Sequence, residues 1–179
     1  METISPTPNA PSVGRLRWAA LLIPAILVLV TDQLTKSLVM RDVGLGEVVS
    51  PIPALAEVFG ITFSRNTGAA FSILPQLGDI FLIVALVMIT GIILFYRRMG
   101  TGHWPERIAL GLLLGGTLGN ALDRLEHGFV VDWVMLRLPG VITNVSNLAD
   151  HAIVISVGVL FILQLIPQRT LRKKPEQVD

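Results

Sequence analysis

The residues best suited to chemistry are two carboxylates in the second half of the chain, Asp132 and Asp150. Asp132 lies in the apolar, strand-like stretch Gly128 to Trp133, and Asp150 ends the run Asn147 to Asp150. Two carboxylates that come close together share a proton, because both cannot be charged cheaply. The charged one can remove a proton from water while the protonated one polarises a carbonyl. Such a pair could hydrolyse a peptide bond without a metal or a covalent intermediate.

Both aspartates also have structural interpretations, and the sequence leaves these open. Asn147 followed three residues later by Asp150 is typical of a helix start, where such side chains cap the backbone. Asp132 taken alone could be a solvated acid at the edge of a strand. Each residue is therefore a weak signal by itself, and the hypothesis depends on the pair.

Other polar residues lie near the ends of apolar segments, where membrane burial would be costly without a role. Asp32 and Lys36 are one helical turn apart and Asp123 is next to Arg124, so we expect two charge pairs with mainly structural roles. Asn120 and Arg124 could orient a carboxylate or a substrate carbonyl, and a buried hydrogen-bonding network explains them equally well. We expect one group of polar residues at a common depth: Asp32, Asn120, Asp123, Arg124, Asp132, Asn147 and Asp150.

Other catalytic chemistries find little support in the sequence. There is no cysteine, which excludes a thiolate nucleophile. Ser146 is close to Asp150 and His151, but neighbours at one helix start point in different directions, so a serine triad ranks well below the carboxylate pair. We expect no metal and no cofactor, because the histidines lack the spacing of zinc ligands: His103, His127 and His151.

The composition indicates that lipid surrounds most of the chain. Apolar residues make up 52% of the 179 residues and charged residues only 15%, and the mean hydropathy is +0.68. The net charge of +1 gives no reason to expect nucleic acid, and attraction to anionic lipid explains the basic segment near the C-terminus. We expect one membrane domain.

Four apolar segments are candidates for transmembrane helices, at about 17–40, 77–96, 107–123 and 149–166. The third is the shortest, but Gly111, Gly115 and Gly119 give it a stripe of small residues that lets another helix approach closely. The predicted organisation is a disordered tail at 1–14, a four-helix domain at 15–168 and a basic tail at 169–179.

Basic residues near the span ends predict the orientation, since cytoplasmic loops carry the excess of Arg and Lys. They precede the first span, fill the connection between the second and third, and follow the fourth: Arg15, Arg17, Arg97, Arg98, Arg107, Arg169, Arg172, Lys173 and Lys174. Both termini should therefore be cytoplasmic. The connections 41–76 and 123–148 should face outward, and they hold most of the polar motifs.

The first outward connection has the pattern of a small sheet. Phe59, Ile61 and Phe63 alternate with small or polar residues, which is the period of a half-buried strand. Asn66 to Gly68 supplies turn chemistry, and the apolar stretch Ala69 to Leu74 could lie against the membrane surface.

Together, the polar motifs resemble those of the lipoprotein signal peptidases, also called signal peptidase II, over nearly all of residues 17–168. Each motif alone is common, but their ordered combination is specific. In chain order the motifs are Thr31-Asp32-Gln33 with Lys36, Asn66 to Phe71, Gly116 to Asn120 with Asp123-Arg124, Gly128 to Asp132, and Asn147 to Asp150.

The resemblance implies a fold and a site. The fold would be an all-α integral membrane protein with four transmembrane helices, a small periplasmic β-sheet and a flexible, amphipathic periplasmic helix. Asp132 and Asp150 would be the catalytic pair of an aspartic endopeptidase. The supporting polar residues would be Asp32, Asn66, Asn120, Arg124 and Asn147.

The resemblance also implies a substrate and a location. The substrate would be a diacylglyceryl-modified prolipoprotein, cleaved on the amino side of its lipid-bearing cysteine to release the signal peptide. The enzyme would lie in the bacterial inner membrane with its active site near the periplasmic face. We expect a monomer whose partners are this substrate and membrane lipid.

Two features depart from the family's pattern, and one other class of protein competes. Ser146 stands where the family commonly has an aromatic residue, which bears on local packing, and the N-terminal tail is extended. The competing class is a non-enzymatic membrane protein, such as a small transporter subunit or proton conduit, with polar groups through the membrane depth. The inner halves of the four spans are nearly bare of such groups, which favours the peptidase.

Overall fold

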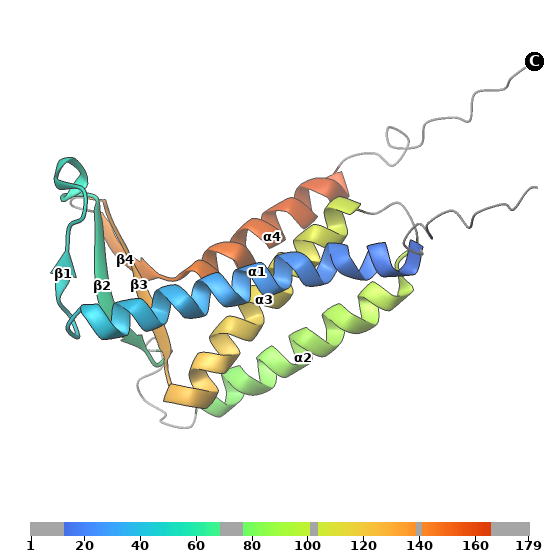
Figure 1. The fold of residues 1–179 in the computed structure, drawn as a ribbon, viewed down its shortest axis with the longest axis horizontal. Helices are drawn as coiled ribbons and strands as arrows, with labels where there is room; N and C mark the ends of the chain where they lie inside the picture. Colours follow the sequence, from blue (N-terminus) through green and yellow to red (C-terminus); the bar gives the residue numbers. More distant parts are fainter. Residues whose placement is uncertain (1–12, 69–76, 101–103, 139–140, 166–179) are drawn as a thin grey trace, which may run out of the picture.

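The computed structural model describes residues 13–68, 77–100, 104–138 and 141–165. Within these ranges, four long helices lie side by side and a small sheet lies across one end of them (Figure 1). In chain order the elements are α1 (Val13–Asp42), β1 (Val48–Val49), the short 3₁₀-helix η1 (Pro53–Leu55), β2 (Phe59–Asn66), α2 (Leu77–Arg98), α3 (Trp104–His127), β3 (Val130–Leu138), β4 (Ile142–Ser146) and α4 (Leu148–Leu165).

The helices agree with the predicted spans, with shifted ends. The first helix begins at Val13, so Gly14 belongs to it rather than to the predicted tail. The third extends to His127, so the connection predicted to start at Asp123 is helical for its first turn. Three predictions lie outside the described residues: the remainder of the N-terminal tail, the surface stretch Ala69 to Leu74 and the basic tail at 169–179.

Helix α3 is the centre of the bundle, because α1, α2 and α4 all pack against it. Its glycines allow this close packing. A Cβ added at Gly115 would lie 2.5 Å from the carbonyl oxygen of Ala25 on α1, and one at Gly116 would lie 2.5 Å from that of Ala149 on α4. The predicted small-residue stripe therefore faces α1, and Gly116 extends the close packing to α4.

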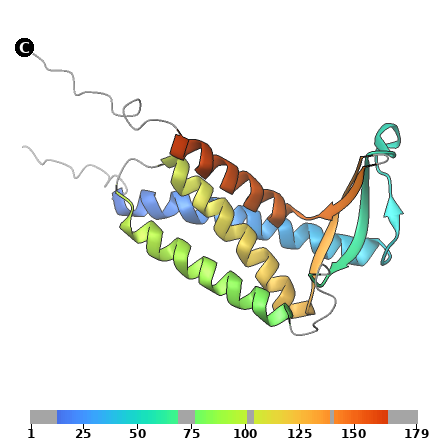
Figure 2. The same ribbon diagram turned by 180° about the vertical axis from the view of Figure 1, so that it is seen from behind.

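Three of the described helices are long and apolar enough to cross a membrane: α1 from Leu16, α2 from Ile80, and α4. Helix α3 is not among them, although its 24 residues would extend about 36 Å. The neighbouring helices cover α3, so small and polar residues take places that lipid-facing helices fill with large apolar ones. Figure 2 shows α3 between α2 and α4 from the opposite side.

The helix surfaces have the opposite pattern to a water-soluble bundle. Large apolar side chains are exposed on the outside, such as Ile26 on α1, Leu86 on α2 and Phe161 on α4. Charged side chains lie inside, among them Lys36 and Arg107, each 1% exposed. This arrangement suits a hydrocarbon solvent, in which apolar side chains need no burial and charges need partners.

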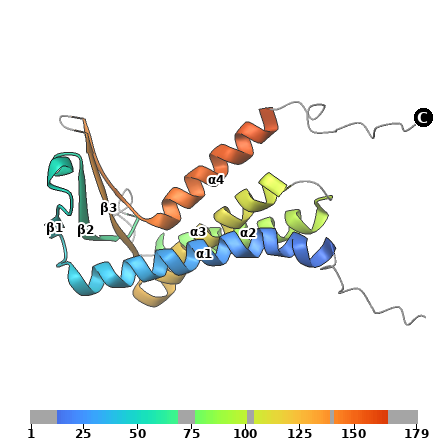
Figure 3. The same cartoon turned by 45° about the horizontal axis from the view of Figure 1, so that its top comes forward.

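The sheet is antiparallel, in the order β1-β2-β3-β4, and connects α1, α3 and α4 at one end of the bundle, here called the sheet end. The strand predicted around Phe59 to Phe63 is present as β2, but a register shift between Ile61 and Ser64 interrupts its alternation. As a result Thr62 and Phe63 are both buried, whereas Ile61 is only half-buried. Figure 3 shows that α4 begins beside the sheet and diverges from α1 towards its other end.

The end of the bundle opposite the sheet holds more buried polar groups than predicted. Arg107 does not lie in a connection; it is in the first turns of α3, buried. It donates to the Tyr96 hydroxyl on α2 and to the Gly100 carbonyl, and Tyr96 donates in turn to the Arg17 carbonyl on α1. The guanidinium therefore ties three helix ends together, a tertiary role that a count of basic residues does not show.

Candidate active site

Two amide side chains from different elements hold Asp132 on β3. Asp132 pairs with Ser64 of β2, which places Asn66, two residues further along, diagonally opposite on the same face. Asn66 Nδ2 donates to Asp132 Oδ2 at 2.8 Å, and Asn147 Nδ2 donates to Asp132 Oδ1 at 2.7 Å. Asp132 is only 3% exposed, so these amides replace the water that would otherwise solvate its carboxylate.

The local backbone fixes the direction of both amides. Asn66 Oδ1 accepts the backbone N–H of Gly68 at 2.9 Å, in a turn where Gly68 has φ +81°. Asn147 Oδ1 accepts the backbone N–H of Asp150 at 2.9 Å, which is the helix-capping bond predicted for α4. With their oxygens engaged, both amides must present N–H groups to Asp132.

Asp150 lies in the first turn of α4. Its Oδ2 is 3.4 Å from the backbone N of Asn147, which completes the reciprocal capping arrangement. Its Oδ1 accepts from Asn120 Nδ2 on α3 at 2.7 Å. The capping interpretation is thus correct. It accounts for only one oxygen of Asp150, because capping alone would not require a partner on a second helix.

The electrostatics of Asp132 favour a shared proton. The pKa of Asp132 is raised to about 6, chiefly by burial and also by the negative charge of Asp150, although hydrogen bonds from Asn66 and Asn147 and the charge of Lys36 partly oppose the rise. A carboxyl with a pKa near 6 can hold or release a proton close to neutral pH, which general acid catalysis requires.

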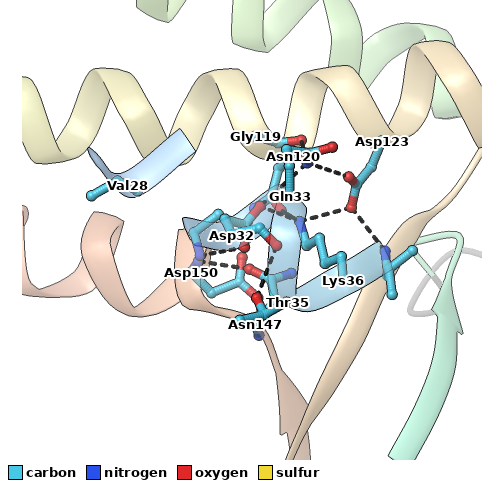
Figure 4. Close-up of polar contacts among 12 residues, drawn as sticks. Val28, Asp32, Gln33, Thr35, Lys36, Gly119, Asn120, Asp123, Asn147 and Asp150 are labelled. Carbon is cyan, nitrogen blue, oxygen red and sulfur yellow. Dashed lines mark hydrogen bonds and ion pairs between the residues drawn. The ribbon is translucent and has the colours of Figure 1, made fainter. Parts of the chain in front are cut away.

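A second cluster of charges lies behind the aspartate pair, centred on Lys36 of α1 (Figure 4). Lys36 Nζ is 2.7 Å from Asp32 Oδ2, 2.7 Å from Asp123 Oδ2 and 3.1 Å from Asn120 Oδ1. Asp32, Lys36 and Asp123 are each at most 1% exposed. The Asp32–Lys36 pair was predicted, whereas the predicted pairing of Asp123 with Arg124 is wrong: Asp123 pairs with Lys36.

Arg124 lies on the far side of Asn120 from Lys36. Its guanidinium donates to the Asn120 backbone carbonyl at 3.1 Å and is 4.8 Å from the centroid of the Phe81 ring. The acids nearby attract its charge, Asp150 first, then Asp123 and Asp132. Arg124 is half-buried.

The predicted polar residues therefore form one continuous network at the sheet end. A path of hydrogen bonds runs from Asn66 through Asp132, Asn147, Asp150 and Asn120 to Lys36, and from there to Asp32 and Asp123. The arrangement offers two carboxylates joined by an amide, at the end of the apolar bundle where the sheet lies across it.

Comparison with known proteins identifies the family. The family model described as Signal peptidase (SPase) II matches residues 24–166. This chain belongs to that family. The lipoprotein signal peptidase of Bacillus subtilis is 37% identical over 153 residues, covering 86% of this chain and 96% of the relative. The lipoprotein signal peptidase of Shewanella loihica is 34% identical over 171 residues, covering 90% and 94%.

Solved structures of bacterial membrane enzymes share the fold. One determined by the in meso method has a TM-score of 0.72 and 29% identity, covering 88% of this chain and 93% of the other. A second has a TM-score of 0.74 and 29% identity, covering 80% and 90%. The chain is thus a multi-pass membrane protein with apolar helices and a small antiparallel sheet.

Sequence reasoning missed part of the hydrogen-bond network around Lys36. Gln33 Nε2 donates to Asp123 Oδ1 at 2.7 Å and to the Gly119 carbonyl at 3.2 Å, which joins α1 to α3. Lys36 was assigned to one carboxylate although it contacts two. A usable signal existed: Lys36 is the one lysine outside the C-terminal tail, on an apolar helix where an ammonium needs more than one partner.

The expected separation of Ser146 and His151 is wrong. Ser146 Oγ lies 3.4 Å from His151 Nε2, because Ser146 ends β4, paired with Val134, while His151 is in the first turn of α4. No acid in the described residues has a recorded contact with the His151 ring, and the Asp150 carboxylate is engaged by Asn120. The contact is therefore a serine–histidine pair without the third member of a triad.

Among the described residues, no group of three or more His, Asp or Glu side chains is arranged to hold a metal ion. The carboxylates of the Lys36 cluster point instead at an ammonium and at backbone N–H groups. These carboxylate oxygens already accept hydrogen bonds from the Lys36 ammonium and from neutral N–H groups.

Proposed function

We propose that this chain is an aspartic endopeptidase that removes signal peptides from diacylglyceryl-modified prolipoproteins, cleaving on the amino side of the lipid-bearing cysteine. One observation carries the proposal beyond family membership: Asn147 links Asp132 and Asp150, donating to one and accepting from the backbone of the other. The two carboxylates thereby lie side by side at the boundary of an apolar bundle, where a lipid-anchored peptide would present its cleavage site.

In the proposed reaction, Asp132 carries the shared proton and Asp150 is the base. Asp132 can hold this proton close to neutral pH because its pKa is raised to about 6, chiefly by burial. Asp150 accepts a hydrogen bond from Asn120 and attracts Arg124. Asp150 removes a proton from water, the water attacks the scissile carbonyl, and Asp132 donates its proton towards the carbonyl oxygen. As the C–N bond breaks, Asp150 gives its proton to the leaving amine and Asp132 takes a proton back from a hydroxyl of the tetrahedral intermediate, which restores the starting state of the pair.

The supporting residues have separate proposed roles. Asn66 and Asn147 hold the Asp132 carboxyl between two N–H donors, and Asn120 holds Asp150. Asp32 fixes the start of α4 through the Ala149 N–H, at 2.9 Å. Arg124 is the group placed to contact the substrate, through a carbonyl near the cleavage site.

An apolar groove suits the lipid part of the substrate. A cavity of about 430 Å³ lies between α1, α2 and α3, and leucines near the sheet end line it, among them Leu82, Leu122 and Leu125. Leu122 and Leu125 flank Asp123 and Arg124 in the sequence, so an acyl chain in this groove would lie at the level of the polar site. This arrangement supports a substrate that is part peptide and part lipid.

The proposed placement is in the bacterial inner membrane, with the sheet end at the periplasmic face and both termini in the cytoplasm. The clustering of Arg97, Arg98 and Arg107 at the end opposite the sheet supports this orientation. We include α3 as a fourth transmembrane helix within a single domain at 15–168, because it runs between the three helices that meet the criteria for a span.

The proposal is tested with the purified full-length chain in detergent–lipid micelles. Cleavage of a precursor carrying a diacylglyceryl-modified cysteine is compared with cleavage of the same precursor left unmodified. We expect release of the signal peptide from the modified precursor alone. Equal cleavage of both would refute the lipid requirement, and cleavage of neither by folded protein would refute the assigned activity.

A further inference from the structure

Two buried carboxylates hold the backbone next to the aspartate pair in the same way. Asp123 Oδ2 accepts the backbone N–H of Val131 at 3.0 Å, and Asp32 Oδ1 accepts the backbone N–H of Ala149 at 2.9 Å. Val131 immediately precedes Asp132, and Ala149 immediately precedes Asp150. Each proposed catalytic aspartate thus follows a residue whose backbone is held by a buried carboxylate of another helix.

Lys36 joins these two anchors. An ammonium group has three N–H donors, and three oxygens lie within reach of Lys36 Nζ: Asp32 Oδ2 and Asp123 Oδ2 at 2.7 Å, and Asn120 Oδ1 at 3.1 Å. Every donor therefore has a partner, and each partner makes a second hydrogen bond beside the aspartate pair (Figure 4). Asp32 accepts from the backbone at the start of α4, Asp123 accepts from the backbone of β3, and Asn120 donates to Asp150 itself.

We propose that Lys36 is a positioning residue that sets the distance and orientation of Asp132 and Asp150, acting through Asp32, Asp123 and Asn120. The inference depends on the proposed function, since it assigns a part of the same site. The role of Lys36 is positioning rather than catalysis, because Asp32, Asp123 and Asn120 already engage all three N–H donors of the ammonium.

The physical argument follows from burial. Asp32 and Asp123 are carboxylates with at most 1% exposure, and within the described part of the chain Lys36 is the one cation that forms an ion pair with either. Without the ammonium, two buried charges would repel each other and Asn120 would lose the bond that keeps its oxygen away from Asp150. The backbone of β3 and the start of α4 would then move independently, and a displacement of about 1 Å at a reacting group can cost on the order of 100-fold in rate.

The test compares Lys36→Met with a matched control, Arg107→Met. Both substitutions remove a cation that is 1% exposed, but Arg107 lies at the opposite end of α3 and contacts Tyr96 and Gly100. Cleavage of a lipidated precursor gives kcat and KM, and hydrogen–deuterium exchange reports on the segments that contain Val131 and Ala149. Both variants are expected to melt at lower temperatures than the unsubstituted protein.

For Lys36→Met we expect kcat to fall by about 100-fold, KM to change by less than about threefold, and exchange to rise in both segments. Arg107→Met should keep kcat within about threefold and leave exchange in those segments unchanged. The proposal is wrong if folded Lys36→Met keeps near-normal kcat, if neither segment exchanges faster, or if Arg107→Met loses as much activity.

If Lys36→Met does not accumulate as folded protein, the charge-matched double variant Lys36→Met/Asp123→Asn takes its place. It removes one positive and one negative charge, so the cluster keeps its net charge while losing the central ammonium. We expect low kcat from this variant, and near-normal kcat would overturn the proposal. Failure of the unsubstituted protein to cleave would refute the proposed function instead, and the exchange comparison would still decide the positioning role.

Discussion

The raised pKa of Asp132 predicts that the active site lowers the stability of the protein at neutral pH, and that Asp132→Asn removes this cost. Burial raises the pKa of Asp132 to about 6, against 3.8 for an ordinary aspartate. Below pH 3.8 the carboxyl is protonated in both the folded and unfolded states and costs nothing. As pH rises through the window from 3.8 to 6, the unfolded chain releases the proton first, so stability falls. At 1.36 kcal/mol per pKa unit, the full cost above pH 6 is roughly 3 kcal/mol.

The substitution also has a cost that does not depend on pH. Asn66 and Asn147 both donate to Asp132, and the oxygens of both amides accept backbone N–H groups. Neither amide can therefore flip to present its oxygen to residue 132. An asparagine at 132 has one acceptor oxygen, which leaves a donor facing a donor at a cost of about 1–3 kcal/mol. The stability of one variant at one pH therefore mixes two opposing effects, whereas the change with pH isolates the first.

Thermal unfolding of the purified proteins in the same detergent measures that change. The stability of Asp132→Asn relative to the unsubstituted protein should rise by up to about 3 kcal/mol between pH 4 and pH 7.5, or roughly 6–12 °C in Tm for a chain of this size. Asp42→Asn, at an exposed aspartate, should show no such rise. A difference between Asp132→Asn and the unsubstituted protein that is constant with pH, or that falls as pH rises, would refute the reasoning.

Three further predictions concern packing, orientation and metal. Gly115→Val should lower Tm strongly and impair cleavage, because its Cβ would meet the Ala25 backbone, whereas Gly158→Val should have little effect, because no atom lies within 4 Å of its added Cβ; melting curves of both variants check this. An alkaline phosphatase fusion should be active near Gly60 and inactive after Lys174, and the reverse pattern would contradict the proposed orientation. A strong chelator should leave cleavage unchanged, and activity lost on chelation and restored by zinc would argue against catalysis by two carboxylates.

The helices and the polar clusters could be predicted because they depend on local patterns. Apolar runs give the three spans, and the Asn147–Asp150 spacing gives the start of α4. The Asp32–Lys36 pair follows from the helical repeat, since residues four apart face the same side. The same rule explains the error at Asp123: adjacent helix residues do not face each other, so its partner came from another helix.

The tertiary contacts could not be predicted from one sequence. The burial of Arg107 depends on how α1 and α2 end beside α3, and the approach of Ser146 to His151 depends on the β3–β4 pairing. Strand β4 itself was missed because its five residues, which include Thr and Asn, lack a clear apolar alternation. In each case long-range packing decides the outcome, and the residues carry no local sign of it.

The central claim, that Asp132 and Asp150 together perform the hydrolysis, is tested most directly by the cleavage rates of Asp132→Asn and Asp150→Asn on a diacylglyceryl-modified precursor. Each amide keeps the shape of the side chain but cannot exchange the shared proton, so each rate should fall at least 100-fold while the protein stays folded in the membrane. Loss of the capping bond alone would cost Asp150→Asn about 1 kcal/mol of stability and leave turnover largely intact. Asp42→Asn should cleave at the normal rate. If either active-site variant, equally abundant and folded, still cleaves near the normal rate, that aspartate is structural and the assigned mechanism is wrong.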